Sequence, residues 1–193
     1  MPIIASSTRR PLFRQRGFSL IEVSIVTAIM ILLAIIGIPA IGGYVVENKV
    51  PKVGEELARF ILQVKVNASG AAEEAYADID TAHFANLVRD SGVFSVAGTG
   101  SAVRVLHGLG SDGRVTVAPQ GAGESFAIEL TNVNHAACPA LASVMQRVAD
   151  VITVAAQGQS AVTVKDATTA YSALVTESHC VQGDRNTFAF IAG

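Results

Sequence analysis

The sequence predicts an α+β protein. A long N-terminal α-helical spine, membrane-spanning in its first half, is expected to pack on a mostly antiparallel β-sheet with a disulfide-bounded C-terminal region. An apolar run of 24 residues without a charged side chain extends from Val23 to Val46, and a helix needs roughly 20 such residues to cross a bilayer core. A one-sided helical pattern follows this run. From Val93 onward, short apolar stretches alternate with glycine-rich turns.

The basic segment at the start predicts the orientation of this helix. Four arginines (Arg9, Arg10, Arg14 and Arg16) precede Gly17, and Glu22 is the only charge between Phe18 and Glu47. Arginines of this kind hold the N-terminal side of a span in the cytoplasm, so the rest of the chain is expected on the opposite side. An ordinary secretory signal has a shorter apolar core with its cleavage site behind it. Here a cut after Gly17 would precede the apolar run.

Length and charge limit what the remainder can be. The 193 residues allow one modest domain beside the helix. Of the 14 Lys and Arg residues, four precede Gly17, which leaves 10 against 16 Asp and Glu residues and a formal charge of −6. A protein of this sign has no general attraction for nucleic acid, so no nucleic-acid binding is expected. With no Trp and 6% aromatic residues, the core is expected to consist largely of Val, Ala, Leu and Ile.

The junction Gly-Phe-Ser-Leu-Ile-Glu at residues 17–22 resembles the processing site of type IV pilins and of the pseudopilins of type II secretion systems. The matching positions are Gly17, Phe18, Leu20, Ile21 and Glu22, followed by an apolar helix that contains Pro39. The resemblance implies that a prepilin peptidase removes residues 1–17 as a leader peptide and methylates the new N-terminus at Phe18. It also implies a transmembrane and filament-core helix over residues 18–47 and a periplasmic globular head over residues 48–193.

Glu22 connects this motif to assembly. A carboxylate among aliphatic side chains is costly unless it is protonated or paired. Lipid headgroups would solvate Glu22 in the free subunit, but a packed filament requires a cationic partner, and cleavage after Gly17 supplies the amine of Phe18. Residues four apart share a helix face, so the pair can form within one helix. The resemblance implies instead that the amine of an incoming subunit meets the glutamate of its neighbour.

Three places predict a bend in the long helix: residues 37–39, Gly42-Gly43 and Pro51. A proline inside a helix removes one backbone hydrogen bond, which neighbouring helices tolerate in a membrane or a filament. Two interpretations of Pro39 stay open, a static kink and a segment that melts during assembly.

Helical spacing continues beyond Pro51. One apolar stripe is expected to lie on the head, and its members are Val53, Leu57, Phe60, Ile61 and Val64. Residues 67–70 are expected to interrupt the helix, and residues 71–77 and 81–90 to form further helices. Asp80 or Thr81 is the expected cap of the second of these and Gly92 its stop.

The strand signals occupy the rest of the chain. Expected strands cover residues 103–106, 114–118, 125–131, 152–155, 162–165 and 186–192, separated by turns. Residues 108–113 are expected to form a hairpin loop, tightest at Asp112-Gly113. Pro139 is expected to begin a helix, with Leu141, Val144, Met145 and Val148 on one face.

Cys138 and Cys180 are the only cysteines. Outside the cytoplasm, two cysteines most simply form one disulfide. The closed loop of 43 residues is worth about 4 kcal/mol on a chain-entropy estimate. His135 and His179 leave a two-Cys, two-His zinc site as the alternative, although the adjacent His179 and Cys180 cannot easily point at one metal.

The resemblance implies that the bridged segment, residues 138–180, is an exposed and variable region. The long leader and the large bridged loop are most similar to type IVb pilins, including those of thin conjugative pili. Phe18 as the first mature residue is more usual in the type IVa group.

No enzyme motif accompanies these features. The phosphate-binding GxxxxGK[ST], HExxH and GxSxG sequences do not occur. The remaining titratable candidates are scattered, and each is interpreted as a surface or core residue: His83, His107, Asp112, Glu124 and Glu129. Neither catalysis nor a cofactor is expected, and no metal.

The leading hypothesis is a structural subunit of a type IV pilus, held in the inner membrane as a precursor and carried on the cell surface once it has polymerised with copies of itself. The implied partners are the prepilin peptidase/methyltransferase, an inner-membrane platform and a motor ATPase. The expected roles are cell adhesion or conjugation. One alternative is a pseudopilin, whose major form usually has a calcium-binding acidic loop for which Asp184 is a poor substitute. The other is a single-pass anchored periplasmic binding domain that does not polymerise.

Overall fold

The computed structural model describes residues 17–68 and 74–193. The chain forms two compact units, Met1–Pro39 and Ala40–Gly193, and each is described by itself. The boundary falls within helix α1 (Leu20–Ala68), eight residues before the expected start of the head at residue 48. Helix α1 includes Gly42-Gly43 and Pro51, so neither ends it. The leader before Gly17 lies outside the described residues.

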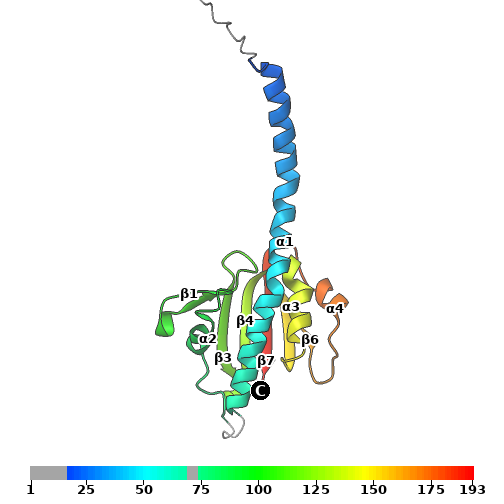
Figure 1. The fold of residues 1–193 in the computed structure, drawn as a ribbon. Helices are drawn as coiled ribbons and strands as arrows, with labels where there is room; N and C mark the ends of the chain where they lie inside the picture. Colours follow the sequence, from blue (N-terminus) through cyan, green and yellow to red (C-terminus); the bar gives the residue numbers. More distant parts are fainter. Residues whose placement is uncertain (1–16, 69–73) are drawn as a thin grey trace, which may run out of the picture. The chain divides into compact units, whose positions relative to one another are not determined.

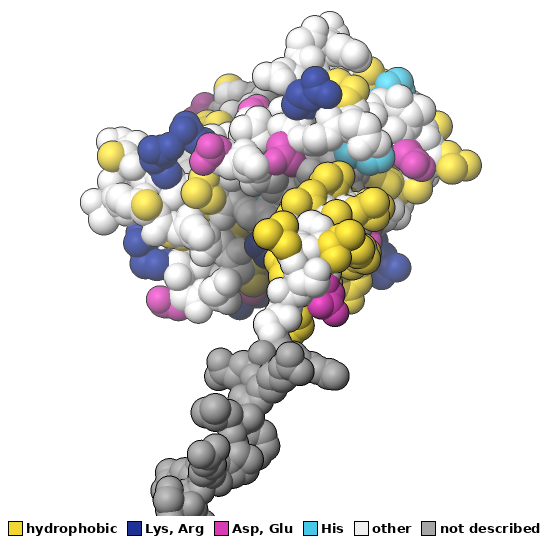
Figure 2. Space-filling view, turned by 90° about the horizontal axis from the view of Figure 1, so that it is seen from above, with side chains coloured by type: hydrophobic (Ala, Val, Ile, Leu, Met, Phe, Trp, Pro, Cys, Tyr) yellow, Lys and Arg dark blue, Asp and Glu magenta, His cyan; other side chains and the backbone are white. Residues whose placement is uncertain are grey.

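The first unit presents an apolar helix with no buried face. Every large apolar side chain from Phe18 to Ile38 is more than half exposed. Figure 2 shows hydrophobic side chains gathered on this part of the chain. Length and composition make α1 the one helix among the described residues that is able to cross a membrane. The predicted apolar helix is therefore present, with its apolar surface uncovered within the chain.

The second unit places the continuation of α1 across a sheet (Figure 1). The stripe predicted from the sequence is confirmed, because Val53, Leu57, Phe60 and Ile61 are all buried. Gly54 lies where helix α3 (Cys138–Met145) approaches α1. A Cβ at Gly54 would lie 2.7 Å from a methyl carbon of Val144, so only glycine permits this approach.

The sheet has seven strands in the order β1-β2-β3-β4-β7-β5-β6, and every neighbouring pair is antiparallel. Its C-terminal strand β7 lies between β4 and β5, in the middle of the sheet (Figure 1). The strands are β1 (Ser95–Ala97), β2 (Arg104–Leu106), β3 (Arg114–Gln120), β4 (Ser125–Asn134), β5 (Val151–Ala156), β6 (Val162–Lys165) and β7 (Asp184–Ala192). All six predicted strands are confirmed, and the three-residue β1 was not predicted.

Helix α2 (Thr81–Val88) begins as predicted, because the Asp80 carboxylate accepts a hydrogen bond from the amide of His83. Helix α4 (Ala173–Ser178) was not predicted. The helix expected over residues 71–77 is wrong over its described part, where residues 74–78 form turns. The reason is tertiary: the Tyr76 amide donates to the carbonyl of Gly123 at 3.0 Å.

Aromatic rings join the elements of the core. The ring of Phe60 on α1 lies 5.0 Å from that of Phe84 on α2 and 6.1 Å from that of Phe126 on β4, both edge to face. Such pairs add to the energy of burial. The buried set is mainly aliphatic, as expected. Composition did not indicate that its few aromatic residues meet where α1, α2 and β4 converge.

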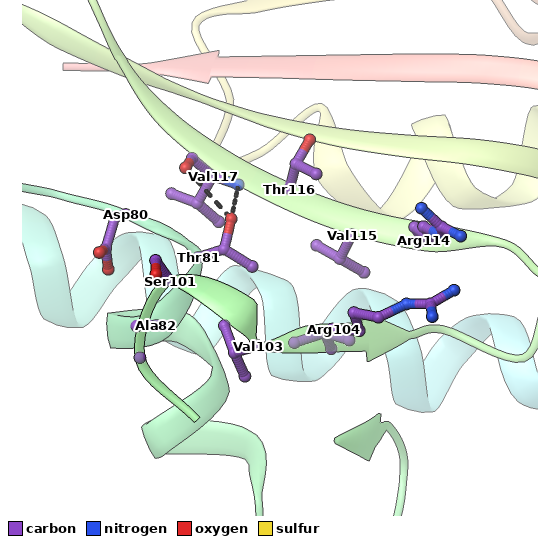
Figure 3. Close-up of a pocket in the computed structure, with 12 residues that line it drawn as sticks. Asp80, Thr81, Ala82, Ser101, Val103, Arg104, Arg114, Val115, Thr116 and Val117 are labelled. Carbon is purple, nitrogen blue, oxygen red and sulfur yellow. Dashed lines mark hydrogen bonds between the residues drawn. The ribbon is translucent and has the colours of Figure 1, made fainter. Parts of the chain in front are cut away.

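The outer edge of β3 is covered beyond its short pairing with β2. The Thr81 hydroxyl accepts a hydrogen bond from the Val117 amide at 3.0 Å and donates to the Val117 carbonyl at 3.4 Å (Figure 3). Two residues further along, Pro119 has no amide hydrogen to offer. Alternate residues of a strand present their amides to the same edge, so both positions are closed to another strand.

Candidate functional site

Glu22 is the carboxylate within the apolar first turns of α1. Phe18, Glu22 and Val26 line one side of this helix, together with Val23 and Thr27. This placement follows from their spacing, since residues four apart share a face. The Glu22 side chain is exposed there among apolar neighbours.

The hydroxyls near Glu22 are satisfied by their own helix. Ser24 donates to the Ile21 carbonyl at 2.8 Å, and Thr27 donates to the Val23 carbonyl at 2.7 Å. Both bonds are local back-bonds that need no partner from outside. The Glu22 carboxylate has no hydrogen bond or ion pair with any residue that the structure describes. A carboxyl group is thus presented on the apolar surface without a partner among residues 17–68 and 74–193.

The disulfide between Cys138 and Cys180 is confirmed, with their Cα atoms 6.3 Å apart. The sulfur atoms are therefore not thiolates that could ligate zinc, which removes the alternative interpretation of these two residues. No group of three His, Cys, Asp or Glu side chains converges within residues 17–68 and 74–193 in a way that could hold a metal ion. His135 instead lies beside Gln182, whose side-chain nitrogen Nε2 is 3.4 Å from the His135 Nδ1.

Two further side chains fasten the chain within and just beyond the bridged region. The Tyr171 hydroxyl donates to the Pro139 carbonyl at 2.8 Å, so it joins the segment before α4 to the start of α3. The buried Asn186 side chain accepts from the Val181 amide at 2.8 Å and donates to the carbonyls of Val181 and Val133. Sequence reasoning missed both, because a lone Tyr or Asn gives no periodic signal.

His107 is fully buried at the end of β2 and has a structural role. Its Nδ1 accepts from the Leu109 amide at 3.0 Å, and its Nε2 donates to the Thr131 carbonyl at 2.8 Å. These partners require the neutral tautomer protonated at Nε2. Burial lowers the pKa of His107, against the hydrogen bond to Thr131 and the charge of Asp184. A Cβ at Gly113 would collide with the imidazole at 2.3 Å, which explains the glycine in this loop.

Asp184 joins the same loop to the start of β7. Its carboxylate accepts from the Ser111 amide at 2.8 Å and from the Asn134 side-chain amide at 2.5 Å. Burial raises the pKa of Asp184, but hydrogen bonds from Ser111 and Asn134 outweigh this and lower it. The carboxylate thus fastens the loop between β2 and β3 to the start of β7.

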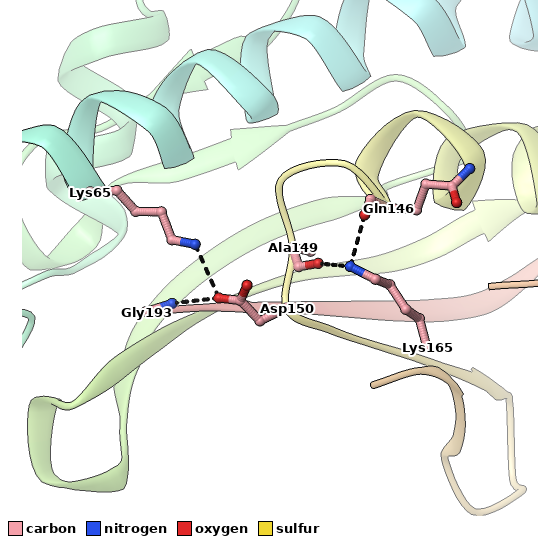
Figure 4. Close-up of polar contacts among 6 residues, drawn as sticks. All are labelled: Lys65, Gln146, Ala149, Asp150, Lys165 and Gly193. Carbon is pink, nitrogen blue, oxygen red and sulfur yellow. Dashed lines mark hydrogen bonds and ion pairs between the residues drawn. The ribbon is translucent and has the colours of Figure 1, made fainter. Parts of the chain in front are cut away.

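Two lysines fasten other parts of the head (Figure 4). Lys65 on α1 forms an ion pair with Asp150 at 3.1 Å, and the same carboxylate oxygen accepts from the Gly193 amide at 3.0 Å. Lys165 on β6 donates to the Gln146 carbonyl at 2.8 Å and to that of Ala149. A cation there compensates the last carbonyls of α3.

The hollow drawn in Figure 3 lies between the start of α2 and strands β2 and β3, and holds about 330 Å³. Arg104 and Arg114 line it from the strands, and Asp80 and Ser101 line it beside α2. The hydrogen bonds of Asp80 go to His83, whose ring lines other hollows. Ser101 has no hydrogen-bonded base among the described residues. These side chains do not form a nucleophile and its base.

The remaining titratable candidates lie apart. Asp112, Glu124 and Glu129 are exposed at separate positions of the head. The His107 ring bonds Thr131 and Leu109, and the His83 ring bonds Asp80. Neither histidine bonds one of these three carboxylates.

An exposed apolar helix that continues into a helix packed on an antiparallel sheet defines a membrane-anchored subunit with a folded head. A family model described as PilS N terminal matches residues 55–193, more than half of the chain. The chain therefore belongs to this family and is a type IV pilin. Pilins of this family are subunits that polymerise into filaments.

One solved structure with similarity to this chain is the crystal structure of TcpA, a type IV pilin from Vibrio cholerae El Tor biotype. It shares 16% identity with a TM-score of 0.45, over 76% of this chain and 99% of that chain. No curated protein matches the chain by sequence.

Proposed function

We propose that the chain is made as a prepilin, that a prepilin peptidase cuts after Gly17, and that Phe18 becomes a methylated N-terminus. Glu22 then pairs the amine of Phe18 as subunits stack through their apolar helices. The observation that carries this proposal is the unpartnered carboxylate on the same face as Phe18. Within a bundle of apolar helices, an unpaired carboxylate costs several kcal/mol, of order 3–5, when its partner is removed.

The exposed helix supports the filament as well as the anchor. Its apolar side chains have no cover within the subunit, so lipid covers them in the precursor and neighbouring helices cover them in the fibre. Identical subunits that contact one another head to tail without closing form a filament. The proposed precursor has its N-terminus in the cytoplasm and its head in the periplasm, in accord with the four leading arginines. A motor ATPase and an inner-membrane platform supply the energy of extraction.

The subgroup and the biological role belong to the same proposal. The bridged segment carries α3, β5, β6 and α4, a large part of the head, and the proposed subgroup is type IVb. Adhesion and conjugation are the proposed roles of the assembled fibre. Pro39 is proposed to permit local rearrangement of the helix during extraction.

The decisive experiment compares two isosteric substitutions in cells. Glu22→Gln is expected to insert and to be cut normally, yet to reduce pilin in sheared surface fractions by about tenfold or more, because the amine loses its counter-ion. Glu47→Gln is the matched control, since Glu47 is exposed beyond the apolar run. Normal fibres from Glu22→Gln would refute the pairing.

Processing is tested separately by mass spectrometry of the mature N-terminus. A methylated Phe18 is expected, and Gly17→Val is expected to retain Met1 and the arginines and to give no fibres. An intact leader on a fully functional wild-type protein would instead favour the anchored periplasmic domain. A processed protein that never reaches sheared fractions would favour a pseudopilin.

A further inference from the structure

A hollow of about 530 Å³ lies in the head, beside the turns of α1 that carry Lys49 and Lys52. Lys49, Lys52 and Val53 line it from α1, the loop between β2 and β3 forms another wall, and the segment from Ser91 to Ser95 lines the rest. All of its lining residues belong to the second unit.

The charge of this hollow is unbalanced. Two lysines, Lys49 and Lys52, and one carboxylate residue, Asp112, line it. Neither lysine has an ion pair or hydrogen bond with any residue in the described ranges, in contrast to Lys65 and Lys165. Asp112 also lacks a hydrogen bond to a described residue. The hollow therefore has an excess positive charge available for an external anion.

The loop leaves room for such an anion. Gly108 has a φ of +64°, and a Cβ added there would lie 3.3 Å from Lys49 Nζ. Gly108 lines this wall, so no side chain from this position fills the space beside the ammonium group. His107 and Asp184 hold the loop in place from behind.

The position of the lysines along α1 indicates which anion is near. The apolar run ends at Val46, so at 1.5 Å per residue Lys49 and Lys52 lie about 4.5 Å and 9 Å further along the helix axis. The headgroup layer on each side of a bilayer is roughly 5–8 Å thick. When the apolar run spans the hydrocarbon core, Lys49 lies at the depth of the lipid phosphates and Lys52 lies just beyond this layer, from where its long side chain can reach back to it.

We infer that this hollow binds the phosphate of an anionic membrane lipid and holds the head against the bilayer before assembly. The inference rests on the proposed membrane topology. Lys49 and Lys52 bind the phosphate oxygens, and Asp112 opposes them. Extraction of a subunit into the fibre then breaks this contact in addition to withdrawing the helix.

The test measures acylation of individual lysines by mass spectrometry, on the full chain in maltoside micelles. Short-chain phosphatidylglycerol is expected to protect Lys49 and Lys52, whereas Lys65 in the same molecules keeps its reactivity. Each lysine near an anionic lipid contributes about fivefold in affinity. Lys52→Gln is therefore expected to shift protection of Lys49 to about fivefold higher lipid concentration, and Asp112→Asn to shift it lower. Lys65→Gln is the matched control and leaves the curve unchanged.

Three results would overturn the inference. Inorganic phosphate that protects as well as the lipid would make the ligand a soluble anion. Protection confined to assembled fibres would make it an acidic surface of a second subunit. No protection in any arm would leave the lysines as ordinary solvated charges. The lipid and phosphate measurements use uncut chain in micelles, so they do not bear on cleavage after Gly17, and an uncut mature protein would not bear on the lipid site.

Discussion

The two halves of helix α1 place their apolar side chains in opposite environments. From Val23 to Ile38 each large apolar side chain is more than half exposed, whereas Val50, Val53, Leu57 and Ile61 are almost completely buried. The second half is completed by its own head. Among the residues that the structure describes, the first half has no apolar partner, and in the proposed function lipid or other subunits bury it. The apolar side chains of the second half are thus buried within the chain, whereas those of the first half are left to be buried by assembly in the proposed function.

The largest expected difference between these halves is in the free energy of unfolding of the head. Leu57→Ala removes a fully buried side chain and is expected to cost about 2–5 kcal/mol. Leu32→Ala, at a position 59% exposed, is expected to change it by less than about 0.5 kcal/mol. Guanidinium unfolding of the full chain in micelles measures both. Equal losses would contradict the division of the helix.

The disulfide should stabilise only the second unit. The double substitution of Cys138 and Cys180 by Ser is expected to lower the free energy of unfolding of the head by about 2–4 kcal/mol. Hydrogen exchange should increase first in residues 166–183, which depend on the bridge and on Tyr171. Residues 50–64 of α1 should keep their protection. Uniform loosening of the whole head would show that the bridge supports more than its own segment.

The head should also respond to acid through His107. The neutral imidazole is favoured in the folded state, so its pKa lies below the ordinary value of 6.5. Its stabilising contribution is complete above pH 6.5 and is lost as the pH falls from there through the folded-state pKa. The slope approaches about 1.4 kcal/mol per pH unit for one proton.

Unfolding midpoints between pH 7.5 and 5 measure this dependence. His107→Gln should flatten the slope, and His83→Gln should retain it, because His83 is exposed. If His83→Gln removed the slope, the pH dependence would belong to His83 and not to His107.

The smallest effect is expected at the ion pair between α1 and β5. Lys65 and Asp150 are partly exposed, and such pairs contribute at most about 1 kcal/mol. Lys65→Met should therefore shift the unfolding midpoint slightly, less than Leu57→Ala or the loss of the disulfide. A loss of more than about 2 kcal/mol would show that Asp150 depends on Lys65 to hold the C-terminal Gly193 amide.

The features that could be predicted from the sequence either repeat with a regular period or involve residues close together in the chain. The stripe of Leu57 and Phe60 follows helical period, Asp80 precedes an apolar helix, and the longer strands alternate. The motif of Gly17, Phe18 and Glu22 is likewise local, and its processing and pairing remain predictions. The two cysteines were informative because only one pairing is available to them.

The remaining features depend on partners distant in the chain. The turn at Tyr76 is set by Gly123, and the role of His107 by Thr131. Strand β1 has three residues, too few to show alternation. Asn186 is buried because three backbone groups from two other segments meet it. None of these contacts has a period or a fixed spacing that a single sequence can display.

The hydroxyl of Thr81 on the border of β3, together with Pro119, has a consequence for crowding. Polymerisation brings many copies of the same head together. Under this condition, strands with unpaired edges can pair with strands of neighbouring copies. The Thr81 hydroxyl bonds both the amide and the carbonyl of Val117. This position therefore has no free backbone group with which a strand of an adjacent copy could pair. Along this stretch of β3, the heads of neighbouring subunits therefore cannot join their sheets.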